Sequence, residues 1–213
     1  RNGRQWQSQH GNLFASLLIG LNCPLSTAAQ LALLAGVVAI DSAAKLLPRE
    51  ARSELLLKWP NDVLLKGGKV AGMLLESTSE AAPNRCKVVI GTGFNLATFP
   101  PDLEQPATSL AAHGGTATPA AAFETLAAVT DAWLTHWAEG VAFQTVRRAW
   151  LDRAGPTGRP LRVRLHGEEA EGSYAGLDSG GALRLLMSDG AERRISAGDV
   201  FFATSKSIPN PIA

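Results

Sequence analysis

The spacing of apolar residues predicts two buried strands and one long helix in the first hundred residues. Residues 12–20 (NLFASLLIG) and 86–95 (CKVVIGTGFN) are short apolar runs bounded by turn-forming residues, which is typical of buried strands. Between them an Ala/Leu-rich segment begins at a capping residue, Ser26 or Thr27, and ends before Pro48. We expect a single helix there. It is apolar on nearly all sides, so a sheet and another helix should cover it.

The middle of the chain predicts a β-hairpin. Gly67-Gly68 separates two β-prone runs, and a two-residue glycine loop suits a turn in which both central residues have positive φ. In that register Lys66 lies opposite Lys69 and Asp62 lies opposite Met73. Asp62 and Lys69 then project from the same face, roughly 13 Å apart at about 3.3 Å per residue. One extended small molecule could span that distance.

The rest of the chain predicts a helical pair and then a second, all-β unit. Thr118 followed by Pro119 indicates a helix start, and this helix should run to about Glu139 and stop at Gly140, with a second helix over residues 143–153. Residues 101–115 are expected to form a surface loop. After residues 155–158 (GPTG), short alternating runs over residues 161–204 predict a small antiparallel barrel of SH3-like type.

Composition narrows the function classes. Apolar residues make up 46% and charged residues 18% of the chain, which indicates a folded globular protein. The net charge of +1 gives no support to nucleic-acid binding by the whole chain. The apolar run over residues 31–40 is about half the roughly 20 residues that a membrane span needs. Cys23 and Cys86 have no zinc-site or disulfide spacing, so we expect two reduced thiols in a cytoplasmic protein.

The opening RNGRQW is the first candidate for chemistry. Arg1 and Arg4 flank Gly3, and Trp6 follows. Arginines beside a glycine are suited to holding phosphates through charge-assisted hydrogen bonds, because the glycine lets the backbone approach the ligand. The alternative is a solvated basic segment, which these six residues alone favour.

The run KWPND, residues 58–62, is the second candidate. It combines a cation, an aromatic ring, a rigid turn and two acceptors in an apolar neighbourhood, where polar groups are costly unless paired or used. The alternative is a structural turn started by Pro60-Asn61. Lys69 projects from the same hairpin, and its alternative is a lysine whose stem covers apolar surface.

Two glycine motifs do not match nucleotide-binding patterns. Gly91 and Gly93, followed by Asn95, lack the third glycine and the helix of a dinucleotide site. The GGK sequence at residues 67–69 lacks the upstream glycine and the following Ser or Thr of a Walker loop.

Taken together, the motifs are far more specific than any one of them. RNGRQW-x(4)-GNLFAS, LKWPNDVLL-x(3)-KVAGMLLE and VVIGTGFN, in this order, resemble the catalytic domain of biotin protein ligases. The resemblance implies an α+β fold: a class II synthetase-like, biotin/lipoate ligase catalytic domain over residues 1–155, then an SH3-like barrel over residues 159–205. It also implies that the chain begins inside the family's Gly/Arg motif and lacks the strand and helix that precede it.

The resemblance implies an ATP-dependent biotin protein ligase. Such an enzyme forms biotinyl-5'-AMP and transfers biotin to a lysine of a biotin carboxyl carrier protein, from acetyl-CoA carboxylase or another biotin-dependent carboxylase. Mg²⁺ would be held mainly by the phosphates of ATP, with no metal site built by the protein. By this resemblance Arg1 contacts the biotin carboxylate and the α-phosphate, and Lys69 contacts the carboxylate and the bridging phosphate oxygens. The acceptor lysine must be neutral to attack, and Asp62 is our candidate to orient it or accept its proton.

The resemblance also implies residues that bind biotin and ATP. Arg4 would support the phosphates, Trp6 would pack near the adenine, and Asn61 would lie at the nucleotide end. The full binding set is Gly3, Arg4, Trp6, Asn61, Gly72, Gly91, Gly93 and Asn95. Some members have an arginine that reaches the nucleotide where this chain has Ala203, so that contact is missing or comes from elsewhere, such as Lys206.

Three other functions compete with this one. A lipoate ligase or octanoyltransferase has a related catalytic fold. A biotin-responsive regulator would need a helix-turn-helix, which this sequence does not show, and we expect neither nucleic acid nor membrane as a partner. A non-catalytic biotin-binding relative would not need Lys69 and Asp62. The acceptor protein is not decided by the sequence, and a homodimer remains an option.

Overall fold

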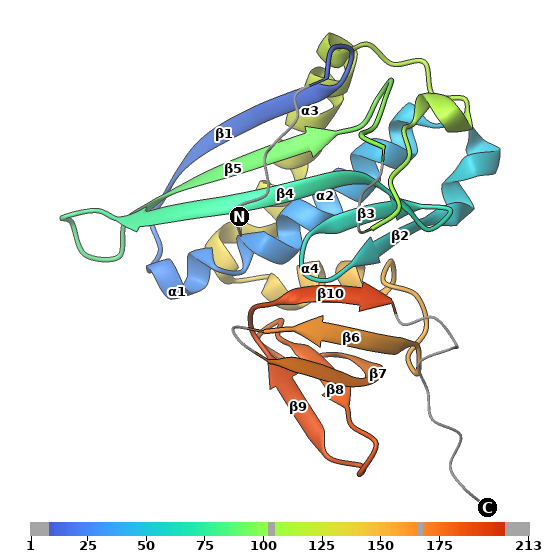
Figure 1. Cartoon of the computed structure of the whole chain (residues 1–213). Helices are drawn as coiled ribbons and strands as arrows, with labels where there is room; N and C mark the ends of the chain where they lie inside the picture. The colour runs from blue at the N-terminus through green and yellow to red at the C-terminus, as the bar shows by residue number, and fades with distance from the viewer. Residues whose placement is uncertain (1–8, 102–104, 166–167, 203–213) are drawn as a thin grey trace, which may run out of the picture. The chain divides into compact units, whose positions relative to one another are not determined.

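The computed structural model describes residues 9–101, 105–165 and 168–202. The chain divides into two compact units, Arg1–Ala154 and Gly155–Ala213, which are treated separately below. The first unit combines a sheet with helices, and the second is built from strands (Figure 1). The α+β fold predicted from the sequence is confirmed.

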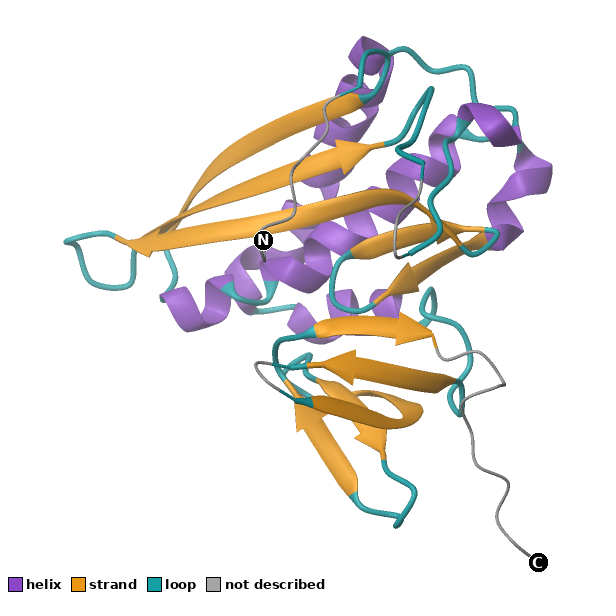
Figure 2. Ribbon diagram, viewed as in Figure 1, coloured by secondary structure: helices purple, strands orange, loops and turns teal. Residues whose placement is uncertain are grey.

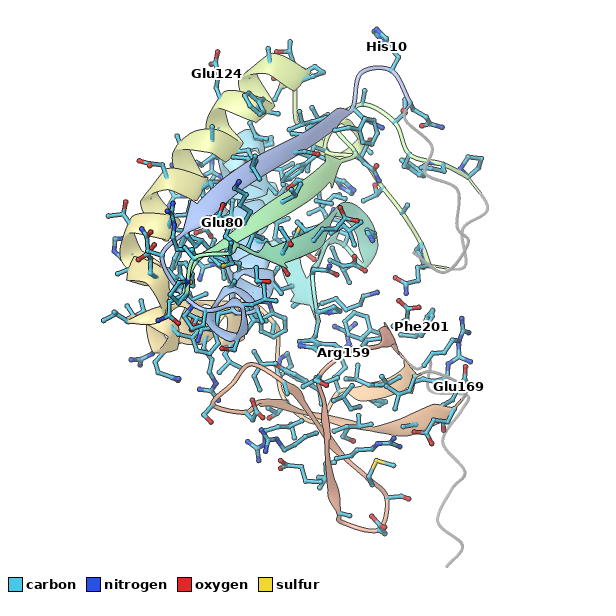
Figure 3. All side chains as sticks on the ribbon, turned by 90° about the vertical axis from the view of Figure 1, so that its left-hand side faces the viewer. His10, Glu80, Glu124, Arg159, Glu169 and Phe201 are labelled. Atoms are coloured by element: carbon cyan, nitrogen blue, oxygen red, sulfur yellow. The ribbon has the colours of Figure 1, made fainter. Side chains whose placement is uncertain are left out.

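The sheet of the first unit has five antiparallel strands in the order β1-β5-β4-β3-β2. The strands predicted at residues 12–20 and 86–95 are confirmed. His10, before β1, and Glu80, after β4, mark opposite ends of this sheet (Figure 3). The strands are β1 Leu13–Leu21, β2 Leu55–Lys58, β3 Asp62–Leu65, β4 Gly68–Ser79 and β5 Cys86–Phe94.

Helices cover one face of this sheet, and no described helix covers the other face (Figure 2). The apolar helix α2 packs against β2, β3 and β4 on one side and against α3 and α4 on the other, as its composition predicted. The helical elements are α1 Leu25–Ala28, α2 Leu31–Leu46, η1 Arg49–Glu54, η2 Ala111–His113, α3 Pro119–Trp137, η3 Ala138–Gly140 and α4 Phe143–Leu151.

The prediction of a single helix capped by Ser26 or Thr27 is wrong. The structure has two helices, and α1 follows Pro24, so both hydroxyl residues lie inside it. The backbone stays right-handed through Ala29 and Gln30, but its hydrogen bonds tighten there to i→i−3. The side chain of Gln30 accepts a hydrogen bond from Trp137 Nε1 at 2.9 Å, which fastens this break to α3.

The segment Leu25–Leu46 meets the length and composition criteria of a membrane-spanning helix. Most of it is buried inside the first unit, and the core helix of a folded unit passes the same criteria. Close packing explains the glycine in its middle: a Cβ at Gly36 would lie 3.2 Å from Trp150 Nε1 of α4. Trp150 is itself 1% exposed, so this contact leaves no room for a larger residue.

The α3 helix was predicted closely. Thr118 Oγ1 accepts from the backbone N–H of Ala121 at 3.3 Å and Pro119 occupies the first turn, as the sequence indicated. The helix ends at Trp137, where Ala138 and Glu139 adopt left-handed φ values of 47° and 51°.

Two buried thiols lie at the end of the sheet near α1. Cys23 and Cys86 are free and buried, as expected for reduced thiols. Cys86 Sγ donates to the carbonyl oxygen of Cys23 at 3.3 Å. Burial, together with the neighbouring Cys86 and Glu139, raises the pKa of Cys23 to about 11, so this thiol stays protonated at neutral pH.

The hairpin forms, but its predicted register is wrong. Its turn is Lys66-Gly67, with φ values of 48° and 82°, and Gly68 pairs with Leu65. The sequence favoured Gly67-Gly68 because lysine adopts positive φ at a steric cost. The register also shifts by one residue between Val63 and Leu64, so Val70 of β4 is the extra residue of a bulge.

The second unit is one antiparallel sheet in the order β10-β6-β7-β8-β9. Its described residues form five strands without a helix, in agreement with the alternating runs of the sequence. Alternate residues of β6, Leu161 and Val163, are buried, which gives the sheet one apolar face. The strands are β6 Pro160–Arg164, β7 Glu169–Leu177, β8 Leu183–Leu186, β9 Glu192–Ile195 and β10 Asp199–Phe202.

Candidate active site

Three charged side chains meet on the hairpin of the first unit. Lys58 ends β2 and lies directly opposite Asp62, the first residue of β3. Asp62 Oδ2 lies 3.0 Å from Lys58 Nζ, and Asp62 Oδ1 lies 2.5 Å from Lys69 Nζ of β4. The predicted separation of roughly 13 Å between Asp62 and Lys69 is therefore wrong. We call these three residues the hairpin charge cluster.

The correct register explains this proximity. It places Gly72, and not Met73, opposite Asp62. The side chain of Lys69 crosses the backbone of Gly72 to reach Asp62, since a Cβ built on Gly72 would lie 2.8 Å from both Cε and Nζ of Lys69. Gly72 was predicted to contact the ligands. In the structure, its lack of a side chain also leaves space for Lys69.

Asp62 is held as a carboxylate. Burial by itself raises its pKa, but the positive charges and hydrogen bonds of Lys69 and Lys58 outweigh this, so the pKa lies below its ordinary value. The exposed fractions of the side chains fall in the order Lys69 38%, Asp62 15% and Lys58 5%. The cluster therefore presents one accessible cation, Lys69, and keeps the other inside.

The backbone of Lys69 is fixed by the loop before η2. Lys69 N–H donates to Pro106 O at 2.8 Å, and Thr108 N–H donates to Lys69 O at 3.0 Å. Asn95 Nδ2 donates to the carbonyl oxygens of both Lys69 and Thr108, at 3.2 and 3.1 Å. Asn95 was predicted to line the pocket, and the structure shows it as a clamp between β4 and this loop. This loop was predicted to lie at the surface, but part of it is buried, since its Leu110 is 2% exposed.

Asn61 also has a structural contact. Its side-chain amide donates to Met73 O, and Met73 N–H donates to Asn61 O at 3.2 Å. The preceding Trp59 is buried and forms a cis peptide bond with Pro60. These contacts fit the structural-turn alternative for KWPND, and the role of Asn61 in nucleotide binding stays a prediction.

Three glycines lie beside the charge cluster, on the face of the sheet that the described helices do not cover. Gly72 lies opposite Gly93, and Gly91 lies opposite Leu74 on the same face. We call these glycines the glycine floor, because at these three positions no side chain covers the sheet backbone. On β1, Phe14 lies opposite Gly93. Phe14 and Leu74 are 37% and 45% exposed, so apolar groups border the floor and the charge cluster ends it. A flat, largely apolar ligand with an anionic end fits this arrangement.

Phe14 and Leu74 were missed as site residues, and Lys58, although part of the candidate run KWPND, was given no role of its own. The first two were assigned to a strand and a hairpin, and only the pairing of β1, β5 and β4 shows which face they share. A signal for Lys58 existed, because a lysine inside the apolar run LLLKW is costly unless paired.

Part of the predicted site lies outside the described residues. Arg1, Gly3, Arg4 and Trp6 belong to this part, as do Ala203 and Lys206 of the second unit. Their assigned roles stay predictions.

Among residues 9–101, 105–165 and 168–202, no group of three or more His, Cys, Asp or Glu side chains could hold a metal ion. The carboxylate in the site, Asp62, is already paired with two ammonium groups. The prediction that Mg²⁺ arrives with the phosphates of ATP is not tested by this arrangement.

Comparison with known families assigns both units. Residues 1–95 match the model of the biotin/lipoate A/B protein ligase family, and residues 157–203 match the biotin protein ligase C terminal domain. The first match contains the charge cluster and the glycine floor.

Individual relatives agree with this assignment. The chain is 35% identical to a biotin--[acetyl-CoA-carboxylase] ligase of Paracoccus denitrificans, over 95% of this chain and 85% of the relative. It is 30% identical to the bifunctional ligase/repressor BirA of Bacillus subtilis, over 92% of this chain and 61% of that protein. The fold is similar to that of a biotin protein ligase from Aquifex aeolicus in complex with biotin and ATP, with a TM-score of 0.76, 23% identity and coverage of 95% and 84%. With the motifs in order along the sequence and both units matched, the chain belongs to the biotin protein ligase family.

Proposed function

We infer that this chain is an ATP-dependent biotin protein ligase, which forms biotinyl-5'-AMP and transfers biotin to a lysine of a biotin carboxyl carrier protein. The observation that carries this inference is the accessible cation Lys69 at the end of the glycine floor. Biotin has the matching chemistry, a compact ring system and an apolar chain that ends in a carboxylate. The relative from Paracoccus denitrificans is a ligase for acetyl-CoA carboxylase, which indicates the class of acceptor.

In the first half-reaction the biotin carboxylate attacks the α-phosphorus of ATP, and pyrophosphate leaves. Two anionic groups must come together, so positive charge is needed to offset their repulsion and to hold them in line. Lys69 supplies such a charge from a fixed backbone position. Mg²⁺ bound to the phosphates would supply further positive charge. Arg1, by its place in the motif, is the proposed second cation.

In the second half-reaction the acceptor lysine, as a neutral amine, attacks the carbonyl carbon of the mixed anhydride, AMP leaves, and the proton that the nitrogen loses passes to solvent. We propose that Asp62 acts on this amine. Because two lysines lower the pKa of Asp62, it is a weak base, and it is better suited to accept a hydrogen bond and orient the amine than to remove its proton. Asp62→Asn should therefore slow transfer from preformed biotinyl-5'-AMP.

Biotin-dependent exchange of pyrophosphate into ATP tests the first half-reaction, and transfer of labelled biotin to an apo carrier domain tests the second. We expect both activities with biotin, and neither with lipoate or octanoate in its place. Activity with lipoate alone would support the lipoate ligase reading. Tight binding of biotin without either half-reaction would support the non-catalytic reading.

We also propose a cytoplasmic location, where the carboxylase acceptors and the reduced thiols Cys23 and Cys86 would be compatible. Fractionation of cells that express the protein tests this proposal. The prediction that neither nucleic acid nor membrane is a partner also stays a proposal, and sedimentation analysis would decide whether the protein forms a homodimer.

A further inference from the structure

We propose that Lys58 is a positioning residue: it keeps Asp62 charged and in place while Lys69 moves from Asp62 to the anionic groups of the substrates. The inference rests on the proposed function for the identity of those anions. Its structural basis is that the two lysines bind different oxygens of one carboxylate, Lys58 at Oδ2 and Lys69 at Oδ1. One cation can therefore leave without disturbing the other.

The surroundings of the two lysines differ in the way this role requires. Lys58 is 5% exposed, and its ammonium also donates to Gln105 Oε1 of the loop before η2. Its β2 backbone is paired directly with Asp62. Lys58 is therefore the fixed cation. Lys69 is 38% exposed and its backbone is held, so its flexible side chain is the movable part.

The charge balance gives Lys58 its importance. The described charged groups that act on Asp62 are Lys69 from β4 and Lys58 from β2. When Lys69 turns to a substrate carboxylate or phosphate, Asp62 keeps Lys58 as its counterion. Without Lys58 the carboxylate would be unpaired at 15% exposure, which is costly. Asp62 would then either retain Lys69, in competition with the substrate, or take up a proton.

Titration of Asp62 in the ligand-free protein tests the first half of this inference. In Lys58→Met, the Asp62 carboxyl resonance should titrate with its pKa raised by about one unit or more relative to the unsubstituted protein. Lys58→Arg should restore the low value, because it keeps the charge. Lys66→Met, an exposed lysine in the turn of the same hairpin, is the matched control and should leave the titration unchanged. An Asp62 titration that is the same with and without Lys58 would overturn the proposal.

Kinetics of adenylate formation test the exchange itself. Lys58→Met should raise the KM for biotin and ATP about tenfold and change kcat less, because substrate anions must compete with Asp62 for Lys69. The same substitution made in an Asp62→Asn background should add no further rise in KM, because the competing charge is already gone. This double variant also removes the buried cation that Asp62→Asn alone would leave without its carboxylate, which favours folding.

A merely structural Lys58 would give another pattern. Its loss would lower the amount of active protein and kcat equally in both backgrounds, with KM unchanged, and this result would overturn the proposal. If the unsubstituted protein shows no biotin-dependent exchange, the proposed function fails, while the titration still decides the role of Lys58.

Discussion

Ion pairs occur in both units, but they differ in burial and therefore in how much they contribute to stability. In the hairpin charge cluster, one carboxylate serves two lysines and is 15% exposed. In the second unit, arginines pair with carboxylates at the surface: Arg184 lies 2.5 Å from Glu192, and Arg164 lies 3.2 Å from Glu169, which Figure 3 labels near Phe201. Water and salt screen the surface pairs, so they contribute little to stability. The comparison indicates that the carboxylate Asp62 depends on its ion pairs more than the surface carboxylates of the second unit do, because it is the less exposed.

Removal of the accessible cation, Lys69, is expected to have the largest effect on activity. Lys69→Met should lower the rate of biotin-dependent pyrophosphate exchange by about 100-fold or more, the range seen when one stabilising group is removed from a site of developing charge. The melting temperature should change little, because Lys69 is the most exposed member of the cluster. Lys66→Met is the control for loss of one positive charge from the hairpin and should keep normal activity.

Gly72→Ala tests whether Lys69 needs the space above the glycine. A methyl group there would lie 2.8 Å from Lys69 Cε and Nζ, so it would displace the lysine side chain from the space through which it reaches Asp62 and, in our proposal, the substrate anions. We expect about a tenfold loss of activity in the exchange assay. Gly20→Ala, on the same face of β1 with nothing within 4 Å of the new methyl group, should behave like the unsubstituted protein. Equal activity of both variants would show that the position of Lys69 is not restricted by Gly72.

Asp62→Asn should lower the free energy of unfolding by about 2 kcal/mol at pH 7, less than the roughly 3–5 kcal/mol for breaking a fully buried pair. Asp62 has a lowered pKa, so its contribution is present above the unfolded pKa of about 3.9 and is lost as the pH falls through the lower folded value. The difference between the two proteins should therefore shrink as urea titrations move from pH 6 to pH 3. Tryptophan fluorescence reports this unit, because all five tryptophans precede residue 155. A constant difference over this range would contradict the ion-pair explanation.

The smallest effect is expected for Arg184→Gln. Its side chain pairs with Glu192 across β8 and β9 at the surface, and the unfolding transition of the second unit should not move measurably in 0.15 M salt. Calorimetry with and without added salt checks this expectation. A clear loss of stability would mean that surface pairs in this sheet act as a network, which would weaken the contrast with the hairpin cluster.

Local signals allowed much of the fold to be predicted. The turn residues around β1 and β5 and the Thr118-Pro119 start of α3 act over a few neighbours, so the sequence shows them directly. The order of motifs identified the family in the same way. The break between α1 and α2 was missed because it depends on a distant contact, between Gln30 and Trp137.

The geometry of the site could not be predicted because it depends on register. The sequence predicted the turn at Gly67-Gly68, yet Lys66 adopts φ of 48° and a bulge at Val70 shifts the pairing. A shift of one residue changes which side chains share a face. It replaced a separation of roughly 13 Å by direct contact. The relation of Phe14 to the glycine floor depends on another long-range pairing, that of β1 with β5.

The two buried cysteines make the protein convenient for labelling. Both native thiols are buried, and burial raises the pKa of Cys23 to about 11. Thiol reagents attack an accessible thiolate, so the native thiols should resist modification at pH 7.5. A cysteine introduced at exposed Lys66 could then carry a single dye beside the charge cluster. Its emission would give a direct signal of substrate binding in a protein that keeps both of its own cysteines.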